Sequence, residues 1–183
     1  MSRLEQAAKP ILVPLMKGER MTLTPDEQGV VAKWFTKTIM AYDINAKRTR
    51  DSYFRLDERV ALMSCLSVPD DTSIFLARYK GSAGHIITKE SHLGNPDKHL
   101  PQMEGYVPTV VIKHLALQLF SFRRAKEPFL GFDIPDWRVA SVQIWPIEGT
   151  INWPPLFTLD DKGLDDFASR WADIGIVLPA PPL

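Results

Sequence analysis

The sequence is poor in the features that mark secreted and membrane-spanning proteins. It has one cysteine, Cys65, so an internal disulfide is excluded, and its place in the apolar run 60–66 indicates a buried thiol in a reducing cytoplasm. The chain does not open with a basic and apolar leader, and no run approaches the roughly 20 apolar residues that span a bilayer. We therefore predict a cytoplasmic protein with no membrane partner.

An excess of charge of either sign is also missing. Twenty-two basic residues balance 22 acidic ones, so no global field drives nonspecific binding to nucleic acid or to membranes. A phosphate-bearing partner would have to be held by a local basic patch. The apolar share of 45% is ordinary for a folded protein, and the length suits one globular domain, residues 1–183.

The motifs of zinc, nucleophilic and phosphate chemistry are absent as well. No Cys-x-x-Cys, His-Glu-x-x-His, Gly-x-Ser-x-Gly, P-loop or Gly-x-Gly-x-x-Gly occurs. His85, His92 and His99 are spaced by seven, which in an extended chain puts consecutive side chains on opposite faces. We expect no metal site and no cofactor, and the absence of motifs favours a noncatalytic protein over an enzyme.

What the sequence does contain is a strong helix signal over residues 22–45. Thr24 is a suitable N-cap, Pro25 suits the first helical position, and Glu27 completes a capping box. Residues that recur at three- and four-residue steps predict a core-facing stripe of Val31, Trp34, Phe35, Thr38, Ala41 and Tyr42.

Further helices are expected within the helical part, residues 1–68. The capping-box spacing recurs at Ser2 and Glu5, so a helix begins almost at the first residue. The prolines at positions 10 and 14 predict that it ends or kinks near Lys9, leaving two short pieces. Residues 52–66 indicate another helix.

A mainly antiparallel sheet of four or five strands is predicted for the sheet part, residues 72–157. Strand signals lie at 73–79, 85–90, 106–122 and 137–145. The first two are expected to pair as a hairpin, and 106–122 as the central strand, with a helix over 110–122 as the rival interpretation.

The chain is expected to end in a helix, residues 158–174, followed by an extended tail, residues 175–183. Thr158 or Asp160 would cap that helix. Together these signals predict an α+β fold in which the N-terminal helices and the C-terminal helix pack on one face of the sheet. The predicted core includes Trp34, Phe35, Val111, Leu117, Phe167 and Trp171.

Clusters of basic residues beside aromatic residues are the candidate binding surface. They contain Lys33, Lys37, Arg48, Arg50, Arg55, Arg59, Arg123 and Arg124. The alternative for each is a solvated cation without a partner. Two histidines are candidates for function, His85 and His114, although a histidine inside an apolar strand, as predicted for His114, is more often structural.

Four stretches carry a resemblance to a known group of proteins: Met1–Glu5, Leu23–Gln28, Trp34–Thr38 and Leu76–Tyr79. They resemble the C-terminal region of uncharacterised bacterial and phage proteins that often carry an HNH-endonuclease-like zinc segment first. In those proteins a Cys-x-x-Cys-Asn stretch lies just ahead of the part similar to Met1–Glu5. The resemblance implies that this chain begins where the zinc-binding part would have ended. No residue here matches the cysteines or the catalytic histidine of an HNH site.

Two classes of function follow. The first is a noncatalytic binding module, of phage or mobile-element origin, that recognises a protein, a nucleic acid or a nucleotide through a local basic surface, and it is compatible with homo-oligomerisation. The second is a small enzyme that uses His85 or His114, or a fragment of an HNH-like nuclease whose zinc and catalytic part lies upstream.

Overall fold

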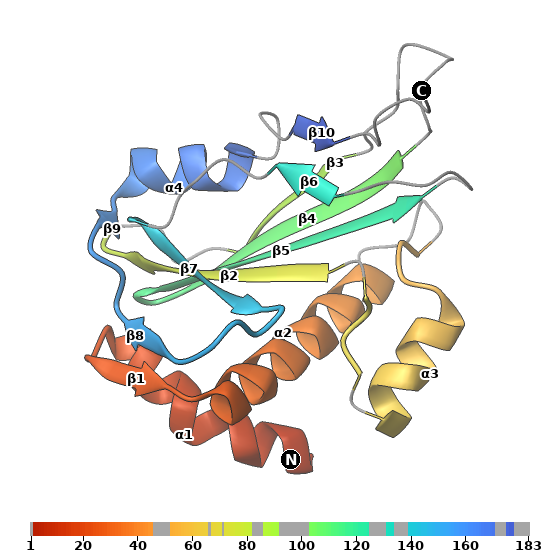
Figure 1. Cartoon of the computed structure of the whole chain (residues 1–183), viewed down its shortest axis with the longest axis horizontal. Coiled ribbons are helices and arrows are strands. Elements are labelled where there is room, and N and C mark those ends of the chain that lie inside the picture. Colours follow the sequence, from red (N-terminus) through yellow and green to blue (C-terminus); the bar gives the residue numbers. More distant parts are fainter. Residues whose placement is uncertain are drawn as a thin grey trace, which may run out of the picture.

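The computed structural model describes residues 2–45, 52–65, 67–70, 72–81, 86–91, 103–124, 131–133, 139–170 and 175–177. Within these ranges the chain forms three helices, with a short strand between the first two, then a series of strands, a further helix and a last short strand (Figure 1). The helices are α1 (Arg3–Lys17), α2 (Pro25–Asn45), α3 (Leu56–Cys65) and α4 (Asp161–Ser169). This is an α+β fold, which confirms the predicted class.

The main sheet is built from strands that follow the spatial order β3-β4-β5-β2-β7. Their bounds are β2 Thr72–Tyr79, β3 Ile86–Ser91, β4 Met103–Ile112, β5 Leu115–Arg124 and β7 Ser141–Trp145. Neighbours in this order pair antiparallel, and β9 (Thr158–Leu159) adds a short parallel pairing to β2. Two small ribbons accompany it: β1 (Met21–Leu23) with β8 (Ile151–Trp153), and β6 (Gly131–Asp133) with β10 (Gly175–Val177).

Helices cover both faces of the sheet, so the expectation that they share one face is wrong. On β2, Ile74 and Leu76 join the core under α1, α2 and α3, whereas Phe75 and Ala77 join a second core under α4. Figure 1 shows α4 across the sheet from the N-terminal helices. Successive side chains of a strand point to opposite faces, so a strand covered on both faces is apolar throughout.

The predicted central strand 106–122 is in fact a hairpin. β4 and β5 pair antiparallel, with Val110 opposite Leu117, and the chain reverses at Lys113 and His114. Lys113 has a φ of 56°, the left-handed conformation that such a two-residue turn needs. The expected pairing of 73–79 with 85–90 is also wrong, because β2 lies between β5 and β7 while β3 pairs with β4.

Helix α1 runs unbroken through both prolines, contrary to the predicted break near Lys9. Pro10 is exposed and Pro14 half-buried, while Ala8 and Leu15 on the other face are fully buried. The hydrogen bonds that the prolines cannot make are therefore lost away from the core, where packing does not depend on them. The helix ends at Gly18, whose φ is 70°, with Glu19 N–H donating to Pro14 O in a Schellman motif.

Helix α2 begins as predicted. Glu27 Oε2 accepts from Thr24 N–H at 2.8 Å, and Glu27 N–H donates to Thr24 Oγ1 at 3.3 Å. The buried stripe, however, is rotated from the predicted one: Ala41 is exposed and Trp34 only half-buried. The buried positions are Gln28, Gly29, Val31, Ala32, Phe35, Thr36, Ile39, Met40 and Asp43.

The last helix is shorter than the predicted 158–174. Asp160 caps α4 by accepting from Gly163 N–H at 2.7 Å, as one of the two predicted caps. Residues 175–177 form β10, so part of the expected tail is a strand. Of the predicted core, Phe35, Val111, Leu117 and Phe167 are buried, Trp34 is half-buried, and Trp171 lies outside the described residues.

A buried arginine fixes α4 to the sheet. Arg170, only 2% exposed, donates from Nε to Gln118 Oε1 at 2.7 Å and from Nη1 to Ser141 Oγ at 3.3 Å. Its guanidinium lies 4.4 Å from the ring centres of both Phe75 and Phe167. Burial lowers the pKa of Arg170 to about 9. The end of α4 is thus held by hydrogen bonds and cation–π packing together.

Candidate functional site

The position of α3 is set by a buried carboxylate on α2. Asp43 is fully buried and its Oδ2 accepts from Ser52 Oγ at 2.6 Å and from Phe54 N–H at 3.3 Å. These bonds hold the segment that leads into α3. A charged acceptor that binds a backbone N–H fixes the direction of the chain at that point.

Aromatic packing completes this attachment. Tyr53 stacks on Tyr106 of β4 with ring centres 5.1 Å apart, and Phe54 meets the same ring edge-on at 5.7 Å. Tyr53 Oη also donates to Ser121 O at 2.8 Å. The residues before α3 are thereby locked onto the sheet, which fixes which face of α3 looks inward.

The outward face of α3 is apolar. Leu56, Val60 and Met63 are 70%, 54% and 73% exposed, whereas Leu62 is 2% exposed. At about 100° per residue, the three exposed side chains fall within about 60° of one another on the helix. We call this row of Leu56, Val60 and Met63 the α3 ridge. Figure 1 places α3 at the edge of the helical layer.

Charged side chains flank the α3 ridge asymmetrically. Arg55 is exposed and Arg59 half-buried on one edge, while the exposed Asp57 lies on the other edge. Arg59 Nη1 donates to Ser52 Oγ at 3.3 Å, one of the five N–H donors of a guanidinium. Two predicted basic residues thus lie together beside an exposed apolar row.

A cavity of about 290 Å³ lies on the inner side of α3. The residues that line it include Glu58, Asp70, Ser67 and Ser121. Glu58 Oε2 accepts from Arg55 N–H at 2.7 Å, so this carboxylate caps the helix. The cavity is acidic and faces away from the α3 ridge, so the two do not form one surface.

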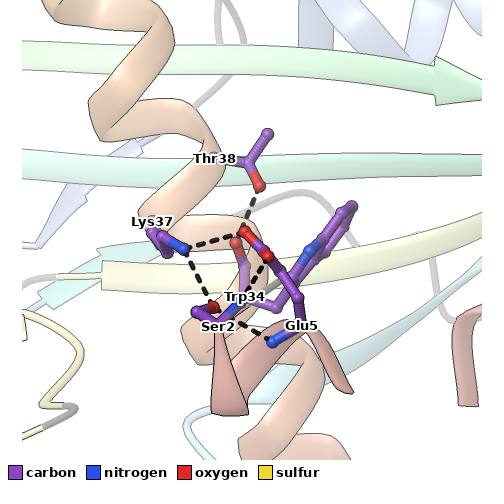
Figure 2. Close-up of polar contacts among 5 residues, drawn as sticks. All are labelled: Ser2, Glu5, Trp34, Lys37 and Thr38. Carbon is purple, nitrogen blue, oxygen red and sulfur yellow. Dashed lines mark hydrogen bonds and ion pairs between the residues drawn. The ribbon is translucent and has the colours of Figure 1, made fainter. Parts of the chain in front are cut away.

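The predicted cation pair on α2 is only partly available to a ligand. Lys37 Nζ lies 3.0 Å from Glu5 Oε1 and donates to Ser2 Oγ at 3.2 Å, and Figure 2 shows these side chains converging between α1 and α2. The backbone hydrogen bond from Ser2 and the bond from Lys37 lower the pKa of Glu5. Lys37 therefore joins two helices, while Lys33, one turn earlier, is half-buried.

For half of the predicted basic residues, the side chain lies outside the part of the chain that the structure describes. Arg48 and Arg50 lie outside the described residues. Arg123 and Arg124 end strand β5, close in sequence to Ser121, which Tyr53 contacts, but their side chains lie outside the described part. Of the remaining four, Arg55 and Arg59 lie at the start of α3, Lys33 lies on α2, and Lys37 of α2 contacts Glu5 of α1.

Of the histidines and the cysteine considered from the sequence, the structure describes the side chain of His114 alone. His114 lies in the β4–β5 turn and is exposed, not inside a strand. Its ring Nδ1 is 3.0 Å from Tyr79 O, and its backbone N–H donates to Met16 O. His85, His92 and His99 lie outside the described residues, as does the side chain of Cys65. In the part of the chain that the structure describes, no three His, Cys, Asp or Glu residues are grouped as metal ligands.

The α3 ridge is not among the predicted sites, although its signal is present in the sequence. Leu56, Val60 and Met63 recur at steps of four and three, which is one apolar stripe. Such a stripe is ordinarily assigned to the core. The bond between Asp43 and Phe54 N–H fixes how α3 is rotated about its axis. In that rotation Leu62 faces inward and the stripe faces outward.

Comparison of the chain with protein-family models, with curated proteins and with solved structures finds no match. Within the described ranges no helix is long and apolar enough to cross a membrane.

Proposed function

We propose that this chain is a noncatalytic binding module that docks a protein partner on the α3 ridge. The observation that supports this is the exposure of Leu56, Val60 and Met63 in one row, at 70%, 54% and 73%. Single exposed apolar residues are common on protein surfaces, but a contiguous row on one helix is typical of interaction sites. An amphipathic helix buries such a row against a partner.

A protein partner is favoured over a nucleic acid by the composition of this surface. Phosphate recognition rests on several cations facing the ligand, and each neutralised phosphate adds to the salt dependence. Here Lys37 is engaged by Glu5, and the chain has no net charge. Nucleic-acid binding through Arg55 and Arg59 is the second candidate, because these two cations border the ridge.

Photo-crosslinking from single sites tests the proposal. A photoreactive amino acid is placed at Val60 or, as the matched control, at the exposed Asp165 of α4 on the opposite face of the sheet. In cells that express the native protein, we expect a discrete protein adduct from position 60 alone. The adduct is identified by mass spectrometry, and the partner is then purified and its affinity measured.

The purified complex gives the decisive result. Val60→Asp should weaken it at least about tenfold, because a buried carboxylate would replace an apolar contact, and Asp165→Lys should leave it unchanged. Circular dichroism checks that both variants fold. Equal adducts from both positions, full affinity of Val60→Asp, or binding only to DNA or RNA with a steep salt dependence would each refute a protein-docking ridge.

A further inference from the structure

We infer that the occupant of the α3 ridge is an amphipathic helix of a different protein, with an apolar stripe and acidic residues along one edge. This inference rests on the proposed function and specifies the partner. Its basis is the shape of the ridge together with the charges that border it.

The shape of the ridge matches a helix. Leu56, Val60 and Met63 follow steps of four and three residues, the rows that interdigitate when two helices pack. The ridge is about 10 Å long, from seven steps of about 1.5 Å, and is therefore roughly two turns. A partner helix of two to three turns would cover it, with its own apolar side chains seated between these three.

The charges select the partner's edge. Arg55 directly precedes α3 and its carbonyl accepts from Arg59 N–H at 3.2 Å, so these two residues stand one turn apart on the same side of the helix. A packed partner helix brings its flanking residues beside this edge, where Asp or Glu would pair with the cations and Lys or Arg would be repelled. The opposite edge carries Asp57, so the preference for acidic residues applies to one edge only.

A second copy of this chain fits less well. Antiparallel self-pairing about a twofold axis near Val60 would place Arg59 against its own counterpart, two like charges close to the axis. Parallel self-pairing about a twofold axis along the helices would place Asp57 of each copy beside the arginine edge of the other, with one carboxylate for two cations. The antiparallel arrangement brings like charges together and the parallel one leaves a cation of each copy without a carboxylate, so a partner with several acidic residues along one edge is the better match.

Two synthetic helical peptides test the inference. Both carry the same leucine stripe over three turns, and they differ in having glutamates or lysines along one edge. Binding to the whole chain is followed by changes in the amide NMR signals of α3. We expect the glutamate peptide to bind with a dissociation constant on the order of 100 µM and the lysine peptide at least about tenfold more weakly.

Variants of the chain separate the possible outcomes. Arg55→Glu with Arg59→Glu should reverse the preference, whereas Arg20→Glu, at an exposed arginine after α1, should not change it. Equal binding of both peptides that is abolished by Val60→Asp would refute the acidic-edge inference and leave the docking ridge intact. Binding of neither peptide, or self-association in sedimentation that Val60→Asp removes, would overturn the inference, and the crosslinking experiment would still decide the proposed function.

Discussion

Truncation of Arg170 to alanine should release the end of α4 from the sheet and destabilise the fold. The change removes the hydrogen bonds to Gln118 Oε1 and Ser141 Oγ and leaves both acceptors buried. It also removes the guanidinium from the space between Phe75 and Phe167. The expected result depends on how these losses compare with the cost of burying a positive charge.

Both sides of this balance can be sized. Hydrogen bonds from a charged donor contribute about 1.5–3 kcal/mol each, and desolvated cation–π contacts about 2 kcal/mol. The lowering of the Arg170 pKa to about 9 from the ordinary value of a guanidinium corresponds to about 5 kcal/mol against the charged form, at about 1.4 kcal/mol per pH unit. Two such hydrogen bonds and two such ring contacts together exceed this cost by about 2 to 5 kcal/mol. We expect Arg170→Ala to lower the free energy of unfolding by about 2 to 5 kcal/mol.

Urea denaturation at pH 7, followed by tryptophan fluorescence, measures this change. Arg170→Met, which keeps the packing without the charge, should cost less than Arg170→Ala, and Arg20→Ala at an exposed site should change stability by less than about 0.5 kcal/mol. A loss below about 0.5 kcal/mol for Arg170→Ala would contradict the anchoring role.

The pH dependence gives a second test of the same contacts. Because the folded pKa of Arg170, about 9, is below its value in the unfolded chain, the unfolded chain holds more protons from about pH 9 upward. The stability of the wild type relative to Arg170→Met should therefore rise as the pH increases through 9, and fall back as it decreases. A difference that stays constant from pH 8 to pH 10.5 would show that the charge is not desolvated.

Three further predictions concern other contacts. Gly18→Ala should cost about 1 kcal/mol in chemical denaturation, because its φ of 70° strains a side chain, and an unchanged midpoint would count against the Schellman end of α1. Lys37→Met should raise the pKa of Glu5 toward 4.5, measured by NMR titration, and an unmoved pKa would refute the contact. In the wild type, Glu5 contributes to stability above pH 4.5, and this contribution is lost as the pH falls through the lowered pKa of Glu5. In the variant the same contribution should be lost at a higher pH. Leu62→Ala should cost about 2 to 4 kcal/mol and Met63→Ala less than about 0.5 kcal/mol, and similar losses would mean that α3 is rotated.

The parts of the fold that sequence reasoning predicted are those set by local chemistry. The capping boxes at Ser2 and Thr24, and the cap at Asp160, bind partners three residues away, so their spacing is visible in the sequence. The apolar strands and the α+β class also follow from short patterns. These features need no knowledge of what packs against them.

The errors came where distant segments decide the outcome. The reversal at Lys113 lacks the Asn-Gly or Asp-Gly pair that usually marks a two-residue turn, so β4 and β5 looked like one strand. Strand β2 lies between β5 and β7, and its two faces pack in two different cores, under the N-terminal helices and under α4. The fold class is therefore easier to predict than the strand order, which records contacts between residues far apart in sequence.

The candidate site shows the same limit. The capture of Lys37 by Glu5, 32 residues away, could not be read from the spacing of Lys33 and Lys37. The four-residue spacing of Arg55 and Arg59, by contrast, is visible in the sequence. It could not show that the apolar row beside them faces outward.

The exposure of the α3 ridge is a consequence of how α3 is attached. Burying a leucine, valine or methionine fully stabilises a fold by about 1.5–3 kcal/mol each, so turning the helix to bury all three would gain several kcal/mol. That turn would expose Leu62 and bring Arg59 toward the core, and it would oppose the Asp43 and Phe54 contacts that fix the approach to α3. The fold thus keeps its apolar row outside by binding the preceding segment tightly. The burial energy that folding leaves unused at this row remains available to an interface, as the proposed docking of a partner helix requires.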